Sequence, residues 1–304
     1  MPFSGTELLE VCSPNPTEFG AVVGNYIVIP DVGLSSGTHV LPNTGTFTVM
    51  NTSTGDARVF TGLPTSVATD HPTRCASDGS YAWFVPGTSG NLFRINPATG
   101  VVDTPISLSG LAGSRYGLVF VGSKLWMFRN SGYHSIFDFG TSTWTDSASS
   151  AASGSALVSG VKVAGDLIVL ATSTGSYIRV YDEVGHELAA IAPSSGSARG
   201  GGAAIGTKAY FPRPGGTNID VIETISMTGT TLNIAPYYCG GNLAVGDDGW
   251  IYTYDYTTSG GAIVAVSPVT GNVQAAAAAT ARVYRTLIYN ANGSLWIPSG
   301  DPRT

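Results

Sequence analysis

Charge is scarce in this chain. Only 11% of the residues are charged, against about a quarter in an average domain, and three lysines stand beside eleven arginines. The net charge is −6, and no basic stripe runs along the sequence. Binding to nucleic acid depends on clustered positive charge. We therefore expect no nucleic-acid partner.

Cysteine and long apolar runs are also lacking. Cys12, Cys75 and Cys239 are odd in number and far apart, which is typical of small buried residues in a reducing compartment rather than a disulfide framework. No apolar stretch approaches the roughly 18 residues that a membrane span needs. The segment 1–5 has neither the charge nor the apolar run of a signal peptide, so we expect no leader and no membrane insertion.

Residues that carry metal or nucleophile chemistry are few and dispersed. No two of the four histidines lie at a spacing typical of metal ligands: His39, His71, His134 and His186. The run Gly200–Gly202 lacks the lysine and helix start of a phosphate loop. The carboxylates Asp166, Asp220 and Asp255 would meet only if the fold brought them together. The sequence predicts no catalytic residue, no metal site and no cofactor.

What the chain has instead is a repeated unit. A short apolar run, a tight glycine turn and a second apolar run recur at intervals of 41 to 44 residues, after a first interval of 55. The turn glycines are Gly24, Gly79, Gly122, Gly165, Gly206, Gly249 and Gly293. Self-similarity at this period is typical of propellers and other repeat folds.

Within one unit, every segment has the length and composition of a strand. The unit at 74–106 contains four short runs separated by turn formers, including the turn Asn96–Gly100, and none shows a helical period. Four strands joined by short turns make one propeller blade. The sequence predicts an all-β fold, a seven-bladed β-propeller with four-stranded blades.

The two ends of the chain suggest how the ring closes. The last unit stops soon after Pro298, too early for its outer strands, whereas 5–16 looks like a strand and turn without a partner. We expect the segment 5–16 to complete the seventh blade, so that 1–304 is a single propeller domain. The first unit carries an insertion at 31–45, which accounts for its longer interval.

Arginines recur just before the innermost strand of several units. In a propeller, the loops at this position surround the mouth of the central channel. The residues in question are Arg74, Arg115, Arg199 and Arg285, together with the adjacent Tyr116 and Tyr284. Two interpretations remain open: the guanidinium groups bind a carboxylate, phosphate or acidic sugar, or they bond carbonyls of neighbouring blades and tie the ring together.

Tyrosines lie in the loops predicted between second and third strands, which open on the same face. Arg129, His134 and Arg213 are predicted in these loops as well. Exposed tyrosine and arginine on a rigid scaffold are typical of a binding face. The predicted ligand-binding tyrosines of these loops are Tyr133, Tyr254 and Tyr256.

The stretch 92–101, with the turn Asn96-Pro97-Ala98-Thr99-Gly100, resembles the strand–turn–strand signature of quinoprotein-like propellers. It lacks their tryptophan, so the resemblance implies the fold and no cofactor. The chain is also similar in its repeats to the seven-bladed streptogramin lyases, whose His and Glu act with magnesium in the late blades. Here Gly241–Thr304 contains neither residue. That resemblance therefore brings no site residues.

A further resemblance is one of composition. A chain rich in Gly, Ser, Thr and Ala, with far more arginine than lysine, resembles the minor tail proteins of bacteriophages of high-GC hosts. We therefore predict a non-enzymatic module of the phage tail tip, located in the virion and made in the host cytoplasm. Its expected partners are other tail proteins or a host-envelope glycan. The alternative is a propeller enzyme of lyase or glycan-hydrolase type acting at the channel mouth. A cytoplasmic interaction scaffold is a third interpretation, which the lack of charged surface variety disfavours.

Overall fold

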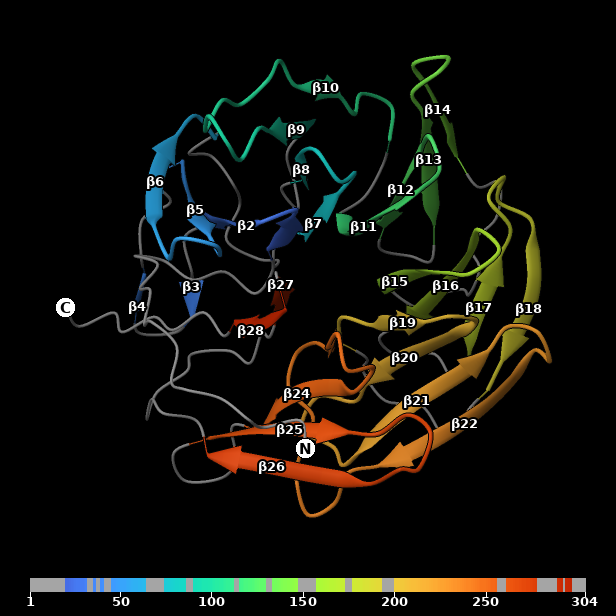
Figure 1. The fold of residues 1–304 in the computed structure, drawn as a ribbon. Coiled ribbons are helices and arrows are strands. Elements are labelled where there is room, and N and C mark those ends of the chain that lie inside the picture. The colour runs from blue at the N-terminus through green and yellow to red at the C-terminus, as the bar shows by residue number, and fades with distance from the viewer. Residues whose placement is uncertain are drawn as a thin grey trace.

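The fold is seen in a computed structural model of the whole chain (Figure 1). The residues that the structure describes are 20–31, 35–36, 39–40, 45–63, 74–85, 90–111, 115–129, 133–146, 157–172, 177–192, 200–255, 261–277, 289–291 and 293–296. The predicted closing segment 5–16 lies outside these residues.

The third blade illustrates how the strands and turns of one repeat unit are arranged. It contains β11 (Arg115–Val121), β12 (Lys124–Arg129), β13 (His134–Asp138) and β14 (Thr143–Asp146), each antiparallel to the next. Gly122 has φ +56° and makes the tight turn between the first two strands. That backbone conformation strains any residue with a Cβ. The glycine therefore fixes where the hairpin reverses.

Five more four-stranded sheets repeat this order. The first is β1 (Ala21–Val23), β2 (Tyr26–Asp31), β5 (Thr46–Asn51) and β6 (Ala57–Thr61). The second is β7 (Arg74–Ser77), β8 (Ala82–Val85), β9 (Asn91–Ile95) and β10 (Ile106–Ser107). The fourth is β15 (Leu157–Val163), β16 (Leu167–Thr172), β17 (Ile178–Tyr181) and β18 (Glu187–Ile191). The fifth is β19 (Ala203–Ile205), β20 (Lys208–Pro212), β21 (Asn218–Glu223) and β22 (Thr228–Asn233). The sixth is β23 (Ala244–Val245), β24 (Ile251–Asp255), β25 (Ala262–Val266) and β26 (Val273–Ala277).

These sheets are arranged as the blades of a propeller. In Figure 1 they follow one another around a common centre, with first strands such as β7, β11, β15 and β19 turned inward and fourth strands such as β18 and β22 at the rim. The expected all-β propeller with four-stranded antiparallel blades is therefore confirmed. No helix that could cross a membrane occurs among the described residues.

The predicted number of blades is not confirmed. The described residues form six four-stranded blades rather than seven, followed by a two-stranded hairpin of β27 (Tyr289–Ala291) and β28 (Ser294–Trp296). This hairpin contacts the innermost strand of the sixth blade on one side and of the first blade on the other. Closure of the ring by an N-terminal strand is not shown. The sequence showed the turn at Gly293 but could not show how many strands would pair around it.

The turn predictions hold in detail. All seven repeat glycines have positive φ, between +55° and +92°. The turns between third and fourth strands use glycine in the same way, as at Gly55, Gly100 and Gly271. The insertion in the first blade contains a small sheet of β3 (Ser35–Ser36) and β4 (His39–Val40).

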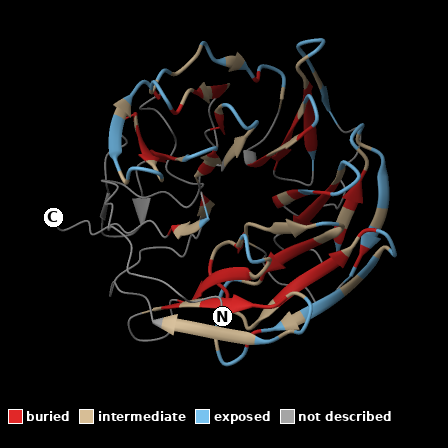
Figure 2. Ribbon diagram, viewed as in Figure 1, coloured by how far each residue is buried: buried red, intermediate tan, exposed pale blue. Residues whose placement is uncertain are grey.

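The hydrophobic core is divided among the boundaries between blades. Phe47 of the first blade packs with Phe84 of the second, and Trp126 of the third packs with Leu170 of the fourth. Each fully buried side chain of this size contributes roughly 1.5–3 kcal/mol. Figure 2 shows the second and third strands of the blades mostly buried and the rim mostly exposed. Because strand residues alternate in direction, Trp83 and Phe84 serve opposite boundaries of one blade. Each blade is therefore stable only beside its neighbours.

Candidate functional site

One face of the propeller carries the predicted site. Antiparallel order places the loops between second and third strands on the same side as the connections between blades. Arg74 is the first residue of β7 and Arg115 the first of β11, with Tyr116 next to it, so their backbones enter the innermost strands from this face. We refer to it as the loop face. The side chains of these three residues, and residues 199, 256, 284 and 285 entirely, lie outside the described part of the chain.

The prediction that Tyr254 lies in an exposed loop is wrong. It lies within β24 rather than in a loop, and its side chain is 2% exposed. Its hydroxyl occupies the space that a Cβ on Gly261 would need. Burial, and to a lesser degree the nearby Asp255 carboxylate, raise its pKa. Tyr254 therefore packs the sixth blade and is not available on an exposed loop.

Tyr133 does lie on the loop face, immediately before β13, and is 36% exposed. Its ring covers the guanidinium of Arg129, with 5.4 Å between Arg129 Cζ and the ring centroid. Arg129 is the last residue of β12, and its side chain is only 4% exposed. Arg129 Nη2 lies 3.0 Å from Asp146 Oδ1, and Ser135 Oγ donates to the same oxygen at 2.5 Å. The Tyr133 ring therefore packs on an arginine that is held in place by Asp146.

His134 is buried beneath this group, again contrary to the expectation of an exposed loop residue. It is the first residue of β13, and its ring stacks on Trp126 at 4.7 Å and meets Tyr181 of the fourth blade at 4.9 Å. Burial lowers the pKa of His134 to about 4, with a smaller contribution from the Arg129 charge. The imidazole is therefore neutral at neutral pH.

A second polar cluster lies between the fifth and sixth blades. Arg213, just after β20, donates from Nε to Asp220 Oδ1 at 3.1 Å and also approaches it through Nη2. Asp220 and Asp255 are both completely buried. Both carboxylates act electrostatically on Cys239, so the fold brings these two distant aspartates to one region. Asp166 lies elsewhere, paired with Lys162 at 2.6 Å.

The connection between these blades covers that cluster. Cys239 forms a parallel bridge with Pro214, and Asn242 forms another with Gly201. Burial raises the pKa of the Cys239 thiol to about 12, so the thiol is not poised as a nucleophile. The connection 234–243 is thus held against the fifth blade at two points.

Gly200–Gly202 form a close backbone contact rather than a phosphate loop. Gly201 N donates to Gly241 O at 2.8 Å, and Leu243 N donates to Gly201 O at 3.0 Å. A Cβ on Gly200 or Gly202 would collide with the neighbouring backbone or with Phe211. The expectation that these glycines carry no phosphate chemistry agrees with this arrangement.

The residues present do not fit the magnesium site that the resemblance to streptogramin lyases implies. Gly241–Thr304 contains no His and no Glu. Within the described ranges, no group of three or more His, Cys, Asp or Glu side chains could hold a metal ion. We therefore derive no step through a metal.

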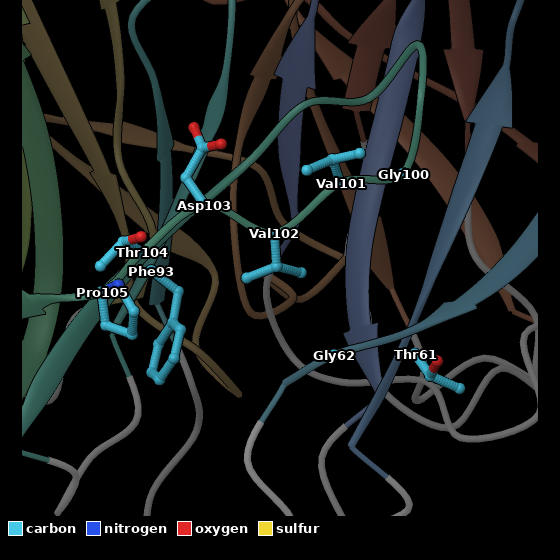
Figure 3. A pocket seen from close by; sticks show the side chains of 9 residues that line it. All are labelled: Thr61, Gly62, Phe93, Gly100, Val101, Val102, Asp103, Thr104 and Pro105. Atoms are coloured by element: carbon cyan, nitrogen blue, oxygen red, sulfur yellow. The ribbon is translucent and has the colours of Figure 1, made fainter.

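A pocket of about 450 Å³ lies at the rim, between the first and second blades. Figure 3 shows Val102 between Phe93 on one side and Gly62 on the other, with Val101 beside Gly100. Its carboxylate, Asp103, accepts from Arg94 Nε at 2.6 Å. The pocket belongs to the outer strands and not to the loop face.

Sequence reasoning missed two exposed tyrosines on the loop face. Tyr177 is 50% exposed and lies immediately before β17, while Tyr238 is 37% exposed on the connection 234–243. Aligning the turns between third and fourth strands across blades would have shown that Tyr177 is equivalent to Tyr133. The tyrosines of the loop face therefore extend from the third blade to the boundary of the fifth and sixth.

The fold and this loop face define the class of the molecule, a β-propeller. Solved structures that match it include virginiamycin B lyase from Staphylococcus aureus, with a TM-score of 0.74 and 14% identity over 94% of this chain and 92% of that one. A catalytically inactive histidine-to-alanine variant of that lyase with quinupristin gives 0.67, with 14% identity over 88% and 86%. A streptogramin B lyase gives 0.62, with 13% identity over 75% of each chain. No family model and no curated protein sequence matches this chain.

At this identity the likeness shows the fold alone. Even so, it contradicts the leading interpretation of the sequence, a non-enzymatic phage tail-tip module, because the matching propellers named above are enzymes. The expectation that the chain is not an enzyme is contradicted on the same ground. The alternative drawn from the sequence, a propeller enzyme of lyase or hydrolase type, agrees better with these structures.

Proposed function

We propose that this protein is a lyase whose substrate binds at the mouth of the central channel, on the loop face. The observation that carries the proposal is the match to virginiamycin B lyase over 94% of the chain. The likeness covers 92% of the length of that enzyme, so it concerns the propeller and not one blade alone. Because Gly241–Thr304 contains no His and no Glu, other residues of this chain must carry the reaction.

A lyase of this kind removes a proton from the carbon next to a carbonyl or carboxylate. The electron pair forms a carbon–carbon double bond, the carbon–oxygen bond one carbon further on breaks, and the leaving oxygen takes up a proton. The intermediate charge lies on the carbonyl oxygens and must be stabilised by a fixed positive group. In the proposal this group is the set of arginines that the sequence predicts at the channel mouth, Arg74, Arg115, Arg199 and Arg285.

A guanidinium group suits this role because it is always charged and binds carboxylates through two parallel hydrogen bonds. Tyr116 and Tyr284 adjoin two of these arginines in sequence. A phenol is one of the side chains that can take part in proton transfer. The substrate class is therefore a carboxylate or ester that carries a leaving oxygen on its β-carbon, the second carbon from the carbonyl. Cyclic ester peptides and uronic-acid glycans belong to this class.

The test is to incubate the purified chain with quinupristin and, separately, with polygalacturonate. A lyase yields products with a new double bond, which absorb in the ultraviolet, and adds no water to their mass. We expect activity on one of these substrates to persist in EDTA. Added mass of one water per cleavage would assign the chain to the hydrolases instead, and no turnover of either substrate would overturn the proposal.

Arg115→Ala then tests the assigned residue. We expect kcat/KM to fall about 100-fold or more, which is typical for loss of a group that stabilises developing charge, and Arg115→Lys to restore part of it. Arg58→Ala is the matched control, because Arg58 is an exposed arginine on the rim strand β6. An Arg115→Ala enzyme as active as the control would remove Arg115 from the site.

A further inference from the structure

Tyr133 and Tyr177 occupy one structural position in consecutive blades. Each is the residue immediately before the third strand, β13 in the third blade and β17 in the fourth. They are 36% and 50% exposed. Both therefore project from the loop face at equivalent points of neighbouring blades.

The fold itself does not require an aromatic residue there. In the other four complete blades, the residue before the third strand is Gly45, Gly90, Thr217 or Gly261. Because sister blades use glycine or threonine at this position, a large ring is not needed there for a blade to form. Exposed aromatic rings on a rigid scaffold are characteristic of binding surfaces instead.

Two arginines that lie close to these tyrosines in the sequence are held in ion pairs. Arg129 under Tyr133 is paired with Asp146, and Arg179, two residues after Tyr177, contacts both carboxylate oxygens of Glu187 at 2.6 Å. Side chains held in this way lose little freedom when a ligand binds. Among the described residues, each of these two guanidinium groups is paired with a carboxylate, which favours a neutral ligand over an anionic one.

We propose that Tyr133 and Tyr177 form a platform for a neutral polysaccharide. A sugar ring has an apolar face that fits the face of an aromatic ring, and its hydroxyls suit the phenolic OH. The equivalent placement in adjacent blades gives two sites that one polymer chain can occupy at once, which raises its overall affinity. Binding here does not depend on the lyase reaction proposed above.

The test is native affinity electrophoresis of the full chain in gels containing β-glucan, xylan or galactomannan, with polygalacturonate as the anionic comparison. We expect at least one neutral polymer to retard the protein, whereas any retardation by polygalacturonate, a candidate substrate of the proposed lyase, should not change in the tyrosine variants. Tyr133→Ala and Tyr177→Ala should each weaken retardation about tenfold, as expected for loss of an aromatic anchor. The double variant should abolish it. A disaccharide should compete poorly, because it cannot reach both rings.

Tyr→Phe variants at both positions keep the rings and should retain binding to within about threefold. Tyr238→Ala removes an equally exposed tyrosine from a different connection and should bind like the unaltered protein. Circular dichroism checks that the alanine variants are folded. The proposal is overturned if no neutral polymer retards the protein, or if the folded alanine variants bind a neutral polymer as well as Tyr238→Ala does.

Discussion

His134 lies where two blades meet, and its ionisation is coupled to that boundary. The ring is 4% exposed and stacked on Trp126, and its pKa falls from the ordinary 6.5 to about 4. The groups that face it are Arg129, Asp146 and Tyr181. The folded state therefore resists protonation over a range in which the unfolded chain takes up a proton.

This difference predicts an acid-sensitive stability. Above pH 6.5 the contribution is fully present, and it is lost as the pH falls from 6.5 towards 4, because the unfolded state then binds more protons. The loss from this group should reach about 3 kcal/mol. Urea unfolding at pH 7 and pH 4.5 measures it. His134→Phe keeps an aromatic ring on Trp126 and should have a shallower pH dependence; an unchanged slope would assign the sensitivity to carboxylates.

At the scale of the turn, the hairpins between third and fourth strands offer a matched comparison. Gly100 and Gly271 both have φ +72° and occupy the same position in the second and sixth blades. A Cβ on Gly100 would collide with the ring of Phe60, whereas a Cβ on Gly271 would meet nothing within 4 Å. The two glycines therefore differ only in their surroundings.

We expect Gly271→Ala to cost about 1 kcal/mol, the strain of a side chain at positive φ. Gly100→Ala should cost a further 1–3 kcal/mol or so, because Phe60 must leave its place beside Phe47. Chemical denaturation of the two variants gives the difference directly. Equal losses would show that Phe60 moves aside freely.

These turns also show what could be predicted from the sequence. Positive φ is a local requirement that glycine meets, so the repeat glycines could be read in advance. The extent of β24 could not, because Tyr254 and Asp255 are kept in the strand by pairing with Ile263 and Ala262 in another part of the chain. The burial of His134 depends on Tyr181 in the next blade, whose ring lies 4.9 Å from the imidazole.

At the scale of the molecule, the hairpin β27–β28 links the two ends of the described ring of blades. Trp296 packs with Ile27 and Ile29 of the first blade. Asn290 Nδ2 donates to Val245 O at 2.9 Å and to Asp247 Oδ1 at 2.8 Å, which attaches the hairpin to the sixth blade. The hairpin is therefore bound to both of its neighbours.

We expect Trp296→Ala to lower the free energy of unfolding by about 3–5 kcal/mol, as for other buried tryptophans. Amide exchange should accelerate in β1 as well as in the hairpin, since both lose a packing partner. Val269→Ala, at a side chain that is 91% exposed, should change stability by less than about 0.5 kcal/mol. Exchange that accelerates in the hairpin alone would show that the first blade does not depend on it.

The placement of apolar clusters between blades has a consequence for synthesis on the ribosome. When β6 has emerged, Val28, Phe47 and Val49 still lack the partners Phe84 and Phe93 that cover them in the finished protein. Each newly translated unit thus covers the apolar residues of the unit before it. Its own apolar surface stays exposed until the following unit has been synthesised. A growing chain of this design stays a target for chaperones until its final residues are released.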